Sequence, residues 1–106
     1  MNNNVKIILG EFLATLLFLT VALGSVAQLV LGTNTFFGIC VAFALGAAIG
    51  IFTSANISGA HMNPAATVAL CLNGRCQWKD MPFYWIGQYL GAFVAAALVF
   101  GTYSDG

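Results

Sequence analysis

The chain carries very little charge. Its 106 residues include three Lys or Arg and three Asp or Glu, so 6% are charged and the formal net charge is +0. Soluble domains carry about 25% charged residues, so this chain cannot cover a water-facing surface with charge. It also lacks the basic field that attracts nucleic acid, and we predict no nucleic-acid partner.

Residues that support chemistry are equally few. The three cysteines, Cys40, Cys71 and Cys76, and the single histidine fit no metal-ligand spacing. No nucleophile, base and orienting acid come together in the sequence. We therefore predict no catalytic residue, no metal and no cofactor, and a protein that is not an enzyme.

Apolar residues, by contrast, dominate. They make up 60% of the chain, and the mean hydropathy is +0.93. Three apolar stretches, at residues 5–31, 36–57 and 83–103, each reach the roughly 20 residues that a membrane-spanning helix needs. The sequence predicts an all-α integral membrane protein with three transmembrane helices.

The first stretch has one rival interpretation, a cleaved signal peptide. Its charged lead would end at Lys6, and Ala22 and Gly24 would be the small residues before the cut. The apolar region is overlong for a signal peptide and contains Glu11, so a spanning helix is favoured.

A fourth apolar run, residues 64–72, is too short to span. As a helix, its nine residues would extend about 13 Å at 1.5 Å per residue, against a hydrocarbon core of about 30 Å. It is predicted to be a re-entrant half-helix or an interfacial helix. Polar residues concentrate just before it, in residues 53–63, and such residues in a membrane segment indicate a functional site.

Asn63 and Pro64 form a strong helix start. The Asn63 oxygen can accept a hydrogen bond from the N–H of Ala65 or Ala66, and Pro64 fits the first helical position. The Asn63 amide nitrogen is then free to donate, beside the positive end of the helix dipole. The carbonyls of residues 59–61 can supply acceptors, so the segment suits a water or hydroxyl oxygen and repels cations.

The basic residues predict the orientation. Lys6 precedes the first span, and Arg75 and Lys79 lie between the second and third. By the positive-inside rule, the N-terminus and the 73–82 loop are cytoplasmic.

Small residues recur every four positions on two spans. They are Gly38, Ala42, Gly46 and Gly50 on the second and Gly87, Gly91 and Ala95 on the third. Stripes of this kind let another helix backbone approach closely, so we predict a compact bundle.

The segment Ser58-Gly59-Ala60-His61-Met62-Asn63-Pro64-Ala65 resembles the first Asn-Pro-Ala signature of the major intrinsic protein family, the aquaporins and aquaglyceroporins. The resemblance covers essentially the whole chain, including Gly10-Glu11-Phe12 and Gln88. Gly24-Ser25-Val26-Ala27-Gln28 and Phe100-Gly101-Thr102-Tyr103-Ser104-Asp105 look more like the glycerol-conducting branch. Ala66 departs from the Val usual in the family.

The resemblance implies a fold of six spans and two half-helices, built as two inverted repeats, with this chain as one repeat over residues 1–106. A second Asn-Pro-Ala motif, and the selectivity arginine beside it, are absent from these residues. The resemblance also implies site roles. Asn63, Pro64 and Ala65 form the pore motif, the Gly59, Ala60 and His61 carbonyls line the pore, Phe43 contributes to the outer constriction, and Glu11 and Gln88 brace the re-entrant loop.

For three of these residues the sequence also allows another role. His61 could hydrogen-bond only within the loop, and Phe43 could be ordinary helix packing. Glu11 could be a proton-relay acid, although buried carboxylates of this kind usually find structural partners.

The predicted function is passive conduction of water and small neutral solutes such as glycerol, with ions and protons excluded. The expected setting is the plasma membrane and, for a full-length protein, a homo-tetramer. The alternative is a truncated, non-conducting half-channel that acts as an assembly or dominant-negative partner of full-length subunits. A homo-dimer of inverted halves is disfavoured, because every Lys and Arg lies on one side.

Overall fold

Within residues 2–103, the part of the chain that the structure describes, the secondary structure is entirely helical. This computed structural model contains helices α1 (Asn3–Val30), α2 (Phe36–Ser58), α3 (Pro64–Leu72), η1 (Trp78–Asp80, a 3-10 helix) and α4 (Met81–Tyr103). Ser104 and Asp105, which belong to the glycerol-branch similarity, lie outside the described residues.

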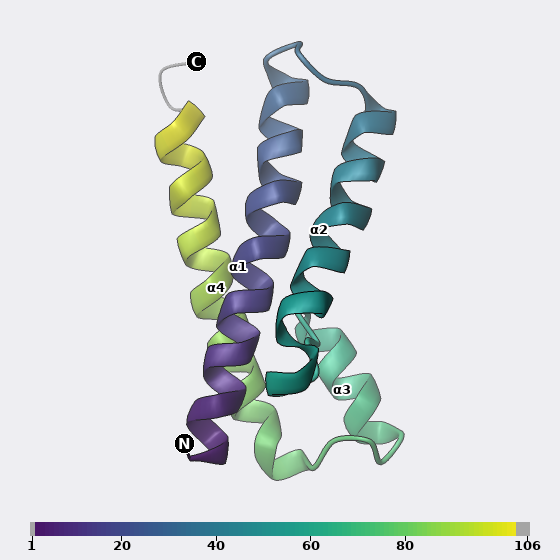
Figure 1. Cartoon of the computed structure of the whole chain (residues 1–106), viewed down its shortest axis with the longest axis vertical. Helices are drawn as coiled ribbons and strands as arrows, with labels where there is room; N and C mark the ends of the chain where they lie inside the picture. Colours follow the sequence, from purple (N-terminus) through teal and green to yellow (C-terminus); the bar gives the residue numbers. More distant parts are fainter. Residues whose placement is uncertain (1, 104–106) are drawn as a thin grey trace.

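Helix α1 is the centre of the bundle. It packs against α2 on one side and α4 on the other, while the short α3 contacts α4 at the end where α1 begins (Figure 1). The longest dimension is 44 Å. Helices α1, α2 and the continuous helical segment Trp78–Tyr103 are long and apolar enough to cross a membrane. The predicted all-α fold of three spanning helices and one half-helix is confirmed.

The interior is more polar than the surface. The largest fully buried side chains are Gln88, Glu11, Thr15, Thr67 and Ser54. Large apolar side chains point outward instead, and Phe37, Phe52 and Phe93 are 77%, 90% and 75% exposed. In water this arrangement would be strongly unfavourable, whereas in a bilayer the exposed apolar side chains contact lipid.

Small residues set the spacing of the helices around α1. A Cβ atom at Gly50 would lie 2.9 Å from the Ala14 carbonyl oxygen, and one at Gly91 would lie 2.7 Å from the Phe12 carbonyl oxygen. The predicted stripes on α2 and α4 are therefore contact surfaces for the α1 backbone. Gly38 is the exception, because it faces the Asn34 side chain of the preceding turn.

The helix ends follow from local side chains. The Thr35 hydroxyl accepts a hydrogen bond from the Gly38 N–H at 3.0 Å and caps α2, and Gly59 ends that helix in the left-handed conformation at φ 91°. Helix α4 begins at Met81, two residues before the expected start. Pro82 is tolerated there because the first turn of a helix leaves its N–H groups without intrahelical partners.

Candidate functional site

The loop between α2 and α3 has an unusual backbone. Gly59, Ala60 and Met62 all have positive φ, at 91°, 52° and 61°. This conformation is uncommon for Ala and Met, and it persists only where the surroundings impose it. The surroundings here are hydrogen-bond acceptors buried between α1 and α4.

The Glu11 carboxylate holds the loop. One oxygen, Oε2, accepts from the Ser58 hydroxyl at 2.6 Å and the His61 N–H at 3.0 Å. The other, Oε1, accepts from the Met62 N–H and the Gln88 amide, both at 2.9 Å. Glu11 is 0% exposed, so these bonds form away from water, where an unpaired donor is costly. The carboxylate therefore fixes the direction of two successive loop N–H groups.

Gln88 has only one possible orientation. Its amide nitrogen donates to Glu11 Oε1 and to the Thr67 hydroxyl, both at 2.9 Å. Of the two amide atoms, only the nitrogen can donate to the carboxylate, so the Gln88 oxygen faces elsewhere. That oxygen and the buried Thr15 hydroxyl have no hydrogen-bond partner within residues 2–103, and both residues line one cavity.

His61 is enclosed by contacts within the protein. Its ring stacks on Tyr84, with centroids 4.1 Å apart and planes 4° from parallel, and its Nδ1 lies 3.0 Å from the Thr67 hydroxyl. The Tyr84 hydroxyl donates to the Ser58 carbonyl at 2.8 Å. The His61 side chain is thus committed to the loop, which leaves its backbone carbonyl as the group that could face a pore.

Asn63 starts α3 as predicted. Its Oδ1 accepts from the Ala65 N–H at 2.8 Å, and Pro64 follows at the first helical position. Its side-chain nitrogen donates no hydrogen bond to any residue that the structure describes, and Asn63 is exposed. The carbonyl oxygens of residues 59–62 accept no hydrogen bond within the described part of the chain. Donor and acceptors therefore occur together in this loop.

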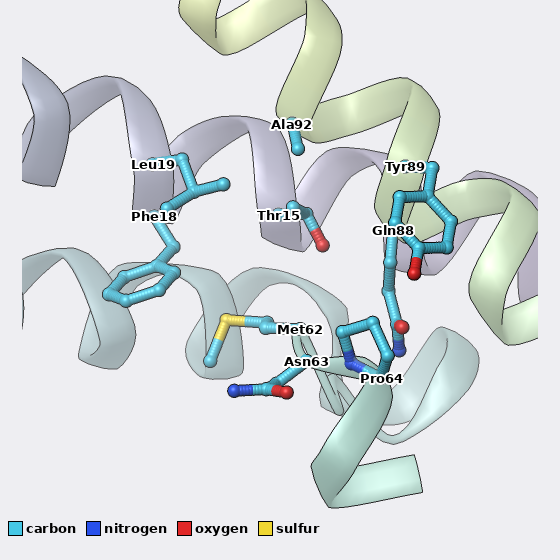
Figure 2. Close-up of a pocket in the computed structure, with 9 residues that line it drawn as sticks. All are labelled: Thr15, Phe18, Leu19, Met62, Asn63, Pro64, Gln88, Tyr89 and Ala92. Carbon is cyan, nitrogen blue, oxygen red and sulfur yellow. The ribbon is translucent and has the colours of Figure 1, made fainter.

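The cavity beside Asn63 has a volume of about 230 Å³ (Figure 2). Its lining residues come from α1, α4, the loop before α3 and the first residue of α3: Thr15, Phe18, Leu19, Met62, Asn63, Pro64, Gln88, Tyr89 and Ala92. The Asn63 side chain lies on one side of it, and the Thr15 hydroxyl points into it from α1. The cavity is mostly apolar with a few convergent polar groups, which is typical of a small-molecule site.

Phe43 lies apart from this cavity. It is 37% exposed on α2 and packs edge-on against Phe18, with ring centroids 5.9 Å apart and planes at 82°. Phe18 lines the cavity, so Phe43 is connected to the site through one aromatic contact.

The structure brings Glu11, Gln88 and the 59–63 loop together, and it adds residues that the sequence analysis missed. These are Thr15, Ser58, Thr67 and Tyr84. A signal existed for two of them. Thr15 follows Glu11 by four residues and Thr67 follows Asn63 by four, so each lies on the same helix face as a predicted site residue.

Within residues 2–103, no cluster of three or more His, Cys, Asp or Glu could hold a metal ion.

Comparison with known proteins identifies the family. The family description "Major intrinsic protein" matches residues 1–106. Human Aquaporin-9 is 45% identical over 101 residues, covering 92% of this chain and 34% of the relative. Mouse Aquaporin-7 is 44% identical over 100 residues, covering 92% and 33%. The chain thus spans about a third of the length of these relatives.

A solved structure agrees with these relatives. The X-ray structure of the aquaglyceroporin from Plasmodium falciparum superimposes with a TM-score of 0.88 at 32% identity, covering 96% of this chain and 43% of that one. From its sequence, its fold and these similarities, the chain belongs to the major intrinsic protein family, which is a family of membrane channels and not of enzymes.

Proposed function

We propose that the chain forms one half of a channel that conducts water and small neutral solutes such as glycerol. The observation that supports this most directly is the loop before α3. Within residues 2–103, its carbonyl oxygens at residues 59–61 accept no hydrogen bond, and the Asn63 amide nitrogen beside them donates none. A solute that sheds its hydration in a narrow pore needs replacement acceptors and donors of this kind.

In the proposed mechanism, each group of the loop and of the start of α3 has a separate role. The Asn63 nitrogen donates to the oxygen of a passing water or hydroxyl, while the carbonyls of Gly59, Ala60 and His61 accept its hydrogens. The N-terminal end of α3 adds a partial positive charge of about half an elementary charge, which disfavours cations and protons. Pro64 and Ala65 hold the start of α3 in position.

We assign Phe43 to the outer constriction of the path. The support for this assignment is that Phe43 is exposed on α2 and packs against Phe18, which lines the cavity. Glu11 and Gln88 take no part in binding the solute in this proposal, and instead keep the loop in its shape.

The proposed orientation places the N-terminus in the cytoplasm. The start of α1, with Lys6, and the segment 73–80, with Arg75 and Lys79, lie at the same end of the bundle (Figure 1). By the positive-inside rule, the end of the bundle that carries the Lys and Arg residues faces the cytoplasm. The plasma membrane and a homo-tetramer of the full-length protein complete the proposal.

A chimera tests the proposed function. The part of this chain that aligns with human Aquaporin-9 would replace the matched segment of that protein, and water and glycerol permeability would be measured by stopped-flow light scattering in liposomes. We expect permeability above empty liposomes, and its loss on Asn63→Asp, which keeps the helix cap but removes the amide donor. An inserted, folded chimera without excess permeability would contradict the proposal.

In a second proposal, the chain is a non-conducting partner of full-length subunits. A permeability measurement on the 106-residue chain alone distinguishes this proposal from the first. Asn63 is exposed and its cavity is open, which favours a requirement for further protein around it. In liposomes holding the chain alone we then expect no excess permeability. Conduction that Asn63→Asp abolishes would contradict the partner proposal and show that the chain assembles a pore by itself.

A further inference from the structure

The C-terminal end of α3 turns back on itself. The Arg75 N–H donates to the Leu70 carbonyl at 2.9 Å, and the Gly74 N–H donates to the Cys71 carbonyl at 3.1 Å. Gly74 adopts the left-handed conformation at φ 77°. Together these form a Schellman motif, which reverses the chain directly after the helix. The reversal brings the residues after Gly74 back toward the last turn of α3.

Two thiols meet at this turn. The Cys71 and Cys76 sulfurs lie 3.9 and 3.6 Å from the same acceptor, the Gln77 carbonyl oxygen. Cys71 is 4% exposed and Cys76 is half-buried. Cys40, by contrast, is exposed on α2 and belongs to neither the turn nor its hydrogen bonds.

The surroundings also disfavour the ionised form of Cys76. Burial raises its pKa to about 12, and the neighbouring Cys71 side chain contributes further. Because the thiolate is the reactive form, Cys76 is weakly reactive toward solutes at neutral pH. Oxidation at this turn is therefore expected to be faster at alkaline pH, where a larger fraction of the thiol is ionised.

We propose that Cys71 and Cys76 form an oxidative modification site that closes into an intramolecular disulfide across the turn after α3. With hydrogen peroxide as the oxidant, one thiolate attacks a peroxide oxygen, the O–O bond breaks, and a sulfenic acid forms with release of the first water. The second thiol then attacks that sulfur, and an S–S bond forms with release of the second water. Two electrons pass from the sulfurs to the peroxide, and both thiol hydrogens end in water.

The bond fastens the end of α3 to the segment that leads into η1. Asn63 caps the N-terminal end of α3 and Pro64 is its first residue, so the modification anchors the half-helix from the opposite end. The site does not depend on the proposed channel function, because its residues lie outside the loop and the cavity.

Arg75 provides a direct test, because trypsin cleaves after it, between the two cysteines. The intact chain in lipid nanodiscs would be treated with hydrogen peroxide, blocked with an alkylating reagent, denatured and digested. In the reduced protein, residues 76–79 are released as a separate peptide. In the oxidised protein we expect that free peptide to be lost, to remain joined to the fragment ending at Arg75, and to return on reduction.

Two variants make the result specific. Cys40→Ser removes the third thiol and is expected to leave the linkage unchanged, which excludes a bond to Cys40. Cys71→Ser is expected to leave residues 76–79 free after peroxide treatment. The proposal is overturned if the wild-type peptide stays free while either sulfur is oxidised singly, or if the linkage survives in Cys71→Ser.

Discussion

Two parts of this molecule are stabilised by different kinds of interaction. Around the loop before α3, a buried polar network formed by Glu11, Ser58, Thr67 and Gln88 fixes the backbone through hydrogen bonds. Along α1, small residues of α2 and α4 fix the spacing of the helices by close contact. Hydrogen bonds are directional, whereas contact between helix backbones sets mainly a distance. The irregular loop therefore depends on the network, and the spanning bundle depends on the glycines.

The largest effect is expected for Glu11→Gln. The carboxylate accepts from both the His61 and Met62 N–H groups, on different oxygens, and a Gln amide can accept on only one of them. A buried N–H without an acceptor remains in either orientation. We expect the free energy of unfolding to fall by about 3–5 kcal/mol. Thermal unfolding in detergent would measure it.

Asp80→Asn serves as the control for Glu11→Gln, because it removes a carboxylate that lies outside the polar network, in η1. It is expected to change the midpoint very little. Equal losses in the two variants would mean that Glu11 does not hold the loop.

A smaller effect is expected for Gly91→Ala. Its new Cβ would lie 2.7 Å from the Phe12 carbonyl oxygen, so α4 must move away from α1. The expected cost is about 1–3 kcal/mol of unfolding free energy, measured in the same unfolding experiment. A Cβ atom at Gly101 on the same helix has no atom of the described residues within 4 Å, so Gly101→Ala is expected to be neutral or stabilising. A loss of the same size at Gly101 would rule out close contact as the cause.

The smallest effect is expected for Tyr84→Phe. It removes the hydrogen bond from the Tyr84 hydroxyl to the Ser58 carbonyl and keeps the ring that stacks on His61. A loss of about 1 kcal/mol is expected in the unfolding experiment. Tyr89→Phe is the matched control, because Tyr89 is 62% exposed on the same helix. Equal unfolding free energies for the two variants would show that the hydrogen bond from Tyr84 to Ser58 does not contribute to stability.

Several features could be read from the sequence because they are local. Asn63 followed by Pro64 indicates a helix start from two adjacent residues, and the structure confirms the cap on Ala65. Repeated small residues predict a helix contact from spacing alone, and Gly50 and Gly91 confirm it. Gly38 fits the same spacing but faces Asn34, because a repeat does not show where the partner helix ends.

Other features depend on tertiary packing and could not be derived from spacing. The Glu11 to Gln88 hydrogen bond joins residues 77 apart in the chain, and the sequence alone gives no distance between them. The positive φ of Ala60 and Met62 runs against the preference of both residue types, so only the surrounding acceptors explain it. The Tyr84 stack on His61 likewise follows from how α4 lies beside the loop.

Amide hydrogen exchange tests most directly the claim that Glu11 holds the loop in a single shape. The exchange of the His61 and Met62 N–H groups would be followed by NMR in lipid nanodiscs, for the wild-type chain and for Glu11→Gln. We predict wild-type protection as strong as in the middle of α1, and its loss at these two residues in the variant. Exchange at His61 and Met62 as fast in the wild type as in residues 73–77, or unchanged protection in the variant, would contradict the claim.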